Sequence, residues 1–330
     1  KRAMREGAFG FSTGLGYVHS RETPYAEIKM LAEIATSFHG VYSTHLRKSG
    51  PGVEDSVKET IKIFEETGVK TIVSHFLPLK GSEAEYGSAL SLVENLPADA
   101  DFHFDIYPFE TTVLPLYTFL PLWVQNGGAE VMRSNISDKW LQPRIVKDFP
   151  EVEPNDIKVA QASGNAALVG KSLGDIMDMY SLVAPREALL KLMLVTKLKA
   201  SVFYKNVNSA LVRKGLSSPR SFISSNAASI GKNRSMERIE RSSATFTKFL
   251  SLVEREGLMP LDEAIRKITA APARTFNLMG RGEVKEGNFA DLTGFKDGEI
   301  KFTVVNGSVA FQNGECTGAR AGKPLRHYGN

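Results

Sequence analysis

The first hundred residues alternate between two patterns of hydrophobic and polar positions. Short apolar or β-branched runs are typical of buried strands, whereas longer stretches with apolar residues every three or four positions are typical of amphipathic helices. These patterns predict strands over 8–12, 41–45, 69–75 and 101–107, and helices over 23–38, 53–66 and 88–96. Strands that alternate with helices in this way indicate a parallel sheet covered by helices.

The alternation ends at Pro108, and a proline-rich segment follows. Residues 109–170 also contain both tryptophans and the pair Gly127-Gly128, and the segment is too long for a simple loop. We therefore expect an inserted subdomain at about 110–170. Beyond it, the patterns predict helices over 172–180, 185–198, 245–256 and 260–269, and a short strand over 222–225.

The pattern changes again after Gly280, where short strands over 287–295 and 302–311 are accompanied by turn residues such as Asn306-Gly307. We interpret residues 280–330 as a small C-terminal β unit and residues 1–279 as the α/β part. The chain begins at Lys1, without a methionine, and leads almost directly into a predicted strand. We therefore expect that a preceding segment is missing.

Composition limits the classes of function. The 330 residues are 42% hydrophobic and 24% charged, which allows a sizeable core. The net charge of +4 is small and the basic residues are spread among acids, so no nucleic-acid surface is predicted. The longest apolar stretch, 113–124, is broken by two prolines and is too short to span a membrane. The single cysteine, Cys316, and the lack of a visible signal peptide favour a cytoplasmic location.

Two histidines end neighbouring strands of the predicted sheet. His45 closes the strand 41–45 and His75 closes the strand 69–75, with one helix between them. Successive parallel strands point the same way, so their C-terminal ends lie together, where such folds place their chemistry. Neutral imidazole is a good ligand for a divalent metal such as zinc. The spacing therefore predicts a metal site, with two ordinary histidines at a sheet edge as the alternative.

Four segments stand in the order seen in the amidohydrolase superfamily: Thr44-His45-Leu46-Arg47, Ser74-His75, Phe104-Asp105-Ile106-Tyr107-Pro108 and Ala290-Asp291-Leu292. The chain most closely resembles the N-acyl-D-amino-acid deacylase (D-aminoacylase) branch, to which the segments 10–15, 267–276 and 318–322 are also similar. The resemblance covers nearly the whole chain. It implies an α/β fold built as a partial (β/α)8 barrel, about strands 4 to 8, with part of a C-terminal β-sandwich.

The resemblance also implies roles for individual residues. His45 and His75 match two histidine ligands of one or two zinc ions, although the family's His-x-His motif has no counterpart here and Cys316 does not match its cysteine ligand. Tyr107 resembles a tyrosine that polarises a substrate carbonyl, with a half-buried aromatic residue as the alternative. The planar fork of Arg47 suits a substrate carboxylate, with a surface ion pair as the alternative.

Two positions depart from the family pattern. The eighth strand of the family ends in Ser-Asp-Gly, whose aspartate binds metal and shuttles protons, but this chain has Ser225-Asn226-Ala227. The family also tends to place a lysine two residues past the second histidine, where this chain has Leu77. A neutral amide cannot act as a base at pH 7. Asn226 in the position of the catalytic base therefore predicts slow turnover, unless it is misaligned and caps the following turn.

Taken together, the resemblance implies a metal-dependent hydrolase of a linear amide. Its substrate would be a small N-acyl-D-amino acid, and its products a D-amino acid and a carboxylate. Two alternatives stay open: a catalytically degenerate homologue that acts as a binding protein, and a dihydroorotase-like hydrolase of cyclic amides. Neither a nucleic acid nor a membrane is expected as a partner, and the sequence leaves homo-oligomerisation open.

Overall fold

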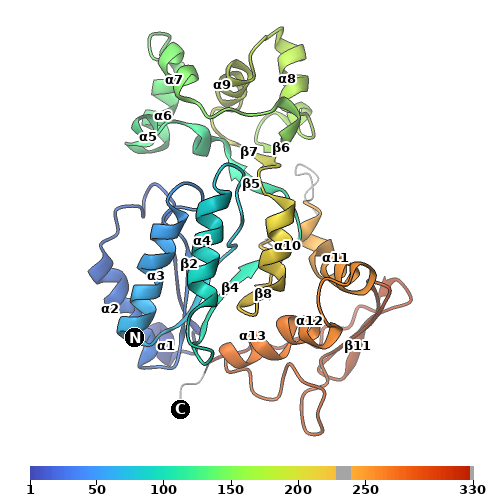
Figure 1. The fold of residues 1–330 in the computed structure, drawn as a ribbon. Helices are drawn as coiled ribbons and strands as arrows, with labels where there is room; N and C mark the ends of the chain where they lie inside the picture. The colour runs from blue at the N-terminus through green and yellow to red at the C-terminus, as the bar shows by residue number, and fades with distance from the viewer. Residues whose placement is uncertain (228–238, 328–330) are drawn as a thin grey trace. The chain divides into compact units, whose positions relative to one another are not determined.

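The computed structural model describes residues 1–227 and 239–327 and is drawn in Figure 1. The chain divides into two compact units. The first, which we call the sheet unit, contains Lys1–Phe109, Asn208–Asn226 and the residues from Ser243 onward. The second, which we call the inserted unit, is built mainly from Glu110–Val207.

The sheet unit is organised around five parallel strands. In spatial order they are β1 (Gly10–Gly14), β2 (Val41–His45), β3 (Lys70–Val73), β4 (Phe102–Ile106) and β8 (Ser221–Ile223). Every neighbouring pair is parallel. The predicted α/β fold with a parallel sheet is thus confirmed, and the residues that follow each strand collect at one edge.

Helices cover this sheet, and Figure 1 shows α3, α4 and α10 side by side along it. The helices of the first part are α1 (Arg2–Arg5), α2 (Tyr25–Thr36), α3 (Val53–Thr67), α4 (Glu83–Glu94) and α10 (Ser209–Ser217). Helix α3 ends at Thr67 and is followed by Gly68, whose left-handed φ of 66° suits a residue just past a helix terminus. The pattern of apolar residues predicted α2, α3 and α4, because one face of each is buried, but it did not predict α1 and α10.

Hydrophobic clusters of described residues pack against this sheet. In one, Ile28 of α2 and Ile63 of α3 pack with Tyr42 of β2. In the other, side chains of β2, β3 and β8 pack with Ala271 of α13 (Ala270–Thr275). Each cluster removes apolar surface from water, worth about 25 cal/mol per Å². This packing fixes the sheet whose edge carries the candidate site.

The inserted unit has its own antiparallel sheet and core. Its strands, in the order β5-β7-β6, are β5 (Thr112–Pro115), β7 (Ala200–Tyr204) and β6 (Ile157–Ala162). Its helices are α5 (Leu122–Gln125), α6 (Gly128–Ser137), α7 (Gln142–Asp148), α8 (Leu173–Tyr180) and α9 (Pro185–Thr196). The unit continues to Val207, beyond the expected end near residue 170, because α8, α9 and β7 share its core.

The last part of the chain forms a helical segment and a small antiparallel sheet. Its remaining helices are α11 (Arg241–Glu256) and α12 (Leu261–Ile268), and its strands are β9 (Leu292–Lys296), β10 (Glu299–Val305), β11 (Ser308–Gln312) and β12 (Glu315–Cys316). Asn306 and Gly307 join β10 to β11 with φ of 44° and 81°, the left-handed pair that a tight hairpin turn requires. Among the described helices, none is long and apolar enough to cross a membrane.

One buried lysine links α12 to β8. Lys267 is only 1% exposed, and its ammonium group donates to the Ser221 hydroxyl at 2.8 Å and to the carbonyl oxygens of Ser221, at 3.3 Å, and Ser218. Burial lowers the pKa of Lys267 from 10.5 to about 8. The folded protein therefore holds this proton less tightly than the unfolded chain does.

The stability difference between the wild type and a Lys267→Met variant should depend on pH. Between pH 8 and 10.5 the unfolded chain binds more protons at this position, so the folded wild type gains stability as the pH rises. Between pH 7 and 9.5 we expect the wild type to gain about 1–2 kcal/mol relative to the variant. Denaturant unfolding of both proteins at the two pH values measures this, and a pH-independent difference would contradict the assigned shift.

The inserted unit should fold when residues 110–207 are expressed alone. Its two ends lie together, because the Val207 amide donates to the Glu110 carbonyl oxygen at 3.1 Å. Its hydrophobic core is built from residues of this segment. We expect cooperative thermal unfolding by circular dichroism. Leu192→Ala, at a fully buried position, should cost about 2–5 kcal/mol. The control Leu122→Ala, at a position 60% exposed, should cost little, and a gradual melt of the wild-type segment would refute this prediction.

Candidate metal and active site

The structure brings the two predicted histidines together. His45 is the last residue of β2, and His75 lies two residues past the end of the adjacent parallel strand β3. The Nδ1 atom of His45 and the Nε2 atom of His75 are 2.9 Å apart, and the ring centroids are separated by 4.6 Å. The two imidazoles therefore meet at the C-terminal edge of the sheet, as the parallel arrangement predicts.

Asp105 holds the backbone of His75 in an unusual conformation. His75 has a left-handed φ of 38°, and its amide donates to the Asp105 carboxylate at 2.9 Å. The same carboxylate oxygen accepts a hydrogen bond from the Ser224 hydroxyl at 2.7 Å. Burial raises the pKa of the Asp105 carboxyl, while these two donors oppose the increase. Asp105 thus ties together the ends of β3, β4 and β8.

Asp105 belongs to the segment 104–108 that carries the family resemblance, but this role of its carboxylate was not predicted. A signal was present, because β4 alternates between buried and less buried positions. Phe102, Phe104 and Ile106 are fully buried on one face of the strand, so an acid between them must face the other side. An acidic residue at the end of such a strand, next to two histidines, points to the site.

The loop after β1 contacts His45 directly. The Tyr17 ring stacks on the His45 imidazole, with centroids 4.9 Å apart and an interplanar angle of 13°. A Cβ atom added to Gly16 would lie 2.5 Å from Nε2 of His45, so only glycine fits at this position. Burial and the neighbouring His75 lower the pKa of His45 to about 4. The imidazole is therefore neutral at pH 7, the form that binds metals.

The histidine pair fits part of a zinc site. Zinc–nitrogen bonds of about 2.0–2.1 Å in a tetrahedron place two ligand nitrogens about 3.3 Å apart. The observed 2.9 Å is a hydrogen bond, so a small widening would accommodate the ion. Within 1–227 and 239–327, however, no group of three or more His, Cys, Asp or Glu could hold a metal. Catalytic zinc usually takes three protein ligands, and the described residues supply two.

The other predicted residues also follow strands of this sheet. Tyr107 comes directly after β4 and is 1% exposed. It is thus more buried than the half-buried aromatic residue that was the alternative to a role in catalysis. Asn226 follows β8 with a left-handed φ of 43°, a conformation that asparagine accommodates better than most residues. The roles of Tyr107 and Asn226 in catalysis stay predictions.

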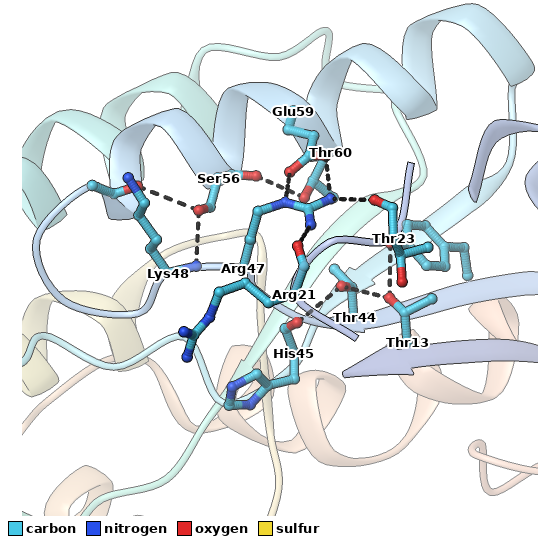
Figure 2. Close-up of polar contacts among 12 residues, drawn as sticks. Thr13, Arg21, Thr23, Thr44, His45, Arg47, Lys48, Ser56, Glu59 and Thr60 are labelled. Carbon is cyan, nitrogen blue, oxygen red and sulfur yellow. Dashed lines mark hydrogen bonds and ion pairs between the residues drawn. The ribbon is translucent and has the colours of Figure 1, made fainter. Parts of the chain in front are cut away.

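Arg47 forms the ion pair that was the alternative to substrate binding. Its Nε and Nη2 atoms donate to the two carboxylate oxygens of Glu59 on α3 at 3.0 and 2.8 Å (Figure 2). The fork that would bind a substrate carboxylate is thus occupied. Binding of a substrate by Arg47 stays a prediction that would require this pair to open.

A model of the amidohydrolase family matches residues 150–310. The resemblance to the amidohydrolase superfamily is confirmed. A D-aminoacylase from Alcaligenes xylosoxydans xylosoxydans is 27% identical over 98% of this chain and 63% of its own length. An N-acyl-D-glutamate deacylase from the same organism is 25% identical over 89% of this chain and 52% of its own length.

Solved structures support the amidohydrolase fold. A crystal structure of D-aminoacylase matches 98% of this chain and 64% of its own with a TM-score of 0.77 and 23% identity. The N-acyl-D-glutamate deacylase from Bordetella bronchiseptica, complexed with zinc and a phosphonate inhibitor, matches all of this chain and 64% of its own with a TM-score of 0.76 and 22% identity. The chain thus spans less than two thirds of the length of these relatives.

Substitution of Gly16 should disturb the candidate site selectively. In a Gly16→Ala variant the added methyl group would overlap Nε2 of His45, so the ring must shift from the position in which its Nδ1 atom faces His75. We expect zinc affinity, measured by titration calorimetry, to fall about tenfold or more, which corresponds to about 1.4 kcal/mol.

The matched control is Gly87→Ala. Gly87 lies on α4, and an added Cβ would have no neighbour within 4 Å. Zinc affinity should be unchanged in this variant, and the helix should gain about 0.5–1 kcal/mol. Equal zinc affinity in both variants would show that Gly16 does not set the position of His45.

Proposed function

We propose that this chain carries part of the active site of a zinc-dependent amidohydrolase that removes the acyl group from N-acyl-D-amino acids. The main support is the pair of touching imidazoles at the C-terminal edge of a parallel sheet, of which His45 is neutral at pH 7. The similarity to deacylases over nearly the whole chain supports the substrate class. In this proposal the five parallel strands correspond to strands 4 to 8 of a barrel, and β9–β12 to part of a β-sandwich.

His45 and His75 are two of the zinc ligands in this proposal, through the nitrogen atoms that face each other. Bound zinc supplies a Lewis acid and lowers the pKa of a bound water toward about 7. A binuclear metal centre is described for a solved structure of D-aminoacylase, so the proposal allows one or two ions. The further ligands lie beyond the described residues or come from groups other than His, Cys, Asp and Glu.

The remaining residues orient the substrate and the ligands. The Tyr107 hydroxyl would donate to the carbonyl oxygen of the amide as negative charge develops there. Asp105 keeps the backbone of His75 turned toward His45 through the 2.9 Å bond from the His75 amide. The proton of the attacking water needs an acceptor, and the position that supplies one in the family is Asn226, a neutral amide.

Asn226→Asp should raise the rate of hydrolysis. Aspartate tolerates the left-handed backbone of this position about as well as asparagine does, so the substitution need not disturb the turn. General-base assistance is typically worth about 10² to 10⁴-fold. The measurement is turnover of N-acetyl-D-amino acids by the protein that contains this chain, supplied with zinc, with and without the substitution.

Asn313→Asp is the matched control, because Asn313 has a similar φ of 53° but lies in the turn between β11 and β12. It should leave the rate unchanged. Wild-type turnover of order 1 s⁻¹ or more would show that another residue serves as the base. A dihydropyrimidine-type cyclic amide assayed in parallel tests the cyclic-amide alternative.

The neutral amide of Asn226 favours a second candidate function, a binding protein that does not catalyse hydrolysis. A homologue that has lost the proton acceptor but keeps the histidine pair can still bind a small molecule. Binding of N-acyl-D-amino acids without hydrolysis, by both the wild type and Asn226→Asp in the presence of zinc, would support this binding protein and exclude the enzyme.

A further inference from the structure

The guanidinium group of Arg47 bonds to two separate parts of the sheet unit, as Figure 2 shows. One edge pairs with Glu59 on α3, as described above. In addition, Nη2 donates to the carbonyl oxygen of Thr23 at 3.2 Å, and Nη1 donates to that of Arg21. The side chains of Arg47 and Glu59 are only 21% and 23% exposed. Such partly buried charges are screened less by salt than surface pairs.

Arg21 and Thr23 lie at the end of the loop that leaves β1. The start of the same loop is bound to the same segment, because the Leu15 amide donates to the His45 carbonyl oxygen at 3.1 Å. Backbone hydrogen bonds close successive turns between these two points. Residues 45–47 therefore hold both ends of the loop 15–23, one end through a backbone carbonyl and the other through the Arg47 side chain.

Between the two attachment points lies the side chain that packs on the candidate metal ligand. Tyr17 stacks on His45, and His19 stacks on Tyr17 with ring centroids 5.8 Å apart. Tyr17 is 44% exposed, so few other side chains hold its ring in place. Its position over His45 consequently depends on the path of the loop.

We propose that Arg47 is a positioning residue for the candidate metal site. Anchored on α3 by Glu59, it clamps the loop 15–23 so that Tyr17 and Gly16 hold the His45 imidazole with Nδ1 toward His75. Arg47 acts on the site through the loop and does not touch the reacting atoms. The proposal takes its site from the proposed function, but the clamp itself requires neither metal nor catalysis.

The same bonds argue against Arg47 as a substrate ligand in this conformation. A guanidinium group pairs with a carboxylate through two parallel N–H donors, and Glu59 already accepts from that edge. Releasing Glu59 would leave a partly buried carboxylate without its main partner, which is costly. A lysine cannot replace the arginine, because one ammonium group cannot reproduce the rigid fork and also reach both carbonyl oxygens.

The test follows the His45 ring by NMR in the metal-free chain. With histidine labelled at Cε1, the chain gives six ring signals, and His45→Gln assigns the one from His45. Tyr17→Leu shows how that signal shifts when the stacked ring is removed. Arg47→Lys and the milder Glu59→Gln should each shift it in the same direction by at least half as much. Tyr17→Leu combined with Arg47→Lys should shift it no further than Tyr17→Leu alone.

The matched control is Lys58→Ala, which breaks the neighbouring exposed ion pair of α3 between Lys58 and Glu54. It should leave the His45 signal in place. Limited trypsin digestion gives a second readout, since cleavage after Arg21 should become several-fold faster in Arg47→Lys and Glu59→Gln but not in the control.

A role confined to general stability would lower the melting temperature without moving the His45 signal. An unchanged His45 signal in a folded Arg47→Lys or Glu59→Gln variant would therefore overturn the proposal. Neither measurement needs zinc or substrate. A failed deacylase assay consequently bears on the proposed function alone, and an unchanged signal bears on the clamp alone.

Discussion

Parallel pairing of five strands is the constraint on which the rest of the site depends. The register pairs Gly14 of β1 with His45 of β2, and Thr44 of β2 with Val73 of β3. Since all strands run the same way, the residues just past each strand must share one edge of the sheet. That edge receives the loop after β1, both histidines, Tyr107 and Asn226, from segments that lie far apart in the sequence.

Asp105 fixes the backbone of residues at this edge of the sheet. Left-handed backbone at a residue other than glycine costs roughly 1–2 kcal/mol, and it occurs both at His75 and at Asn226. The Asp105 carboxylate offsets part of that cost at His75, because it accepts hydrogen bonds from the His75 amide and the Ser224 hydroxyl. Hydrogen bonds to a charged acceptor are worth more than neutral ones. The Asp105 side chain thus holds the turns that follow β3 and β8.

Much of this arrangement could be predicted from the sequence. Apolar periodicity predicted the strands of the parallel sheet and the helices α2, α3 and α4, although not α1 and α10, and the direction of parallel strands was enough to bring His45 and His75 together. Periodicity could not give the end of the inserted unit at Val207, because a helical pattern does not identify the sheet that the helix covers. The pairing of Glu59 with Arg47 could not be predicted either. In the sequence Glu59 resembles Glu54, an acid of the same helix that forms an ion pair with Lys58.

In the proposed function, metal binding and proton transfer depend on residues that follow different strands. The groups that would hold a metal follow β2 and β3, and their positions depend on Asp105 and on the loop after β1. The group that would move a proton follows β8, where the chain has Asn226 in a backbone conformation that aspartate also accepts. In the proposed mechanism, a change at that position acts on the proton acceptor, which follows a different strand from the two histidines. The proposed function therefore assigns metal binding and general-base chemistry to residues that follow different strands of one sheet, and substitution at Asn226 tests the second of these roles.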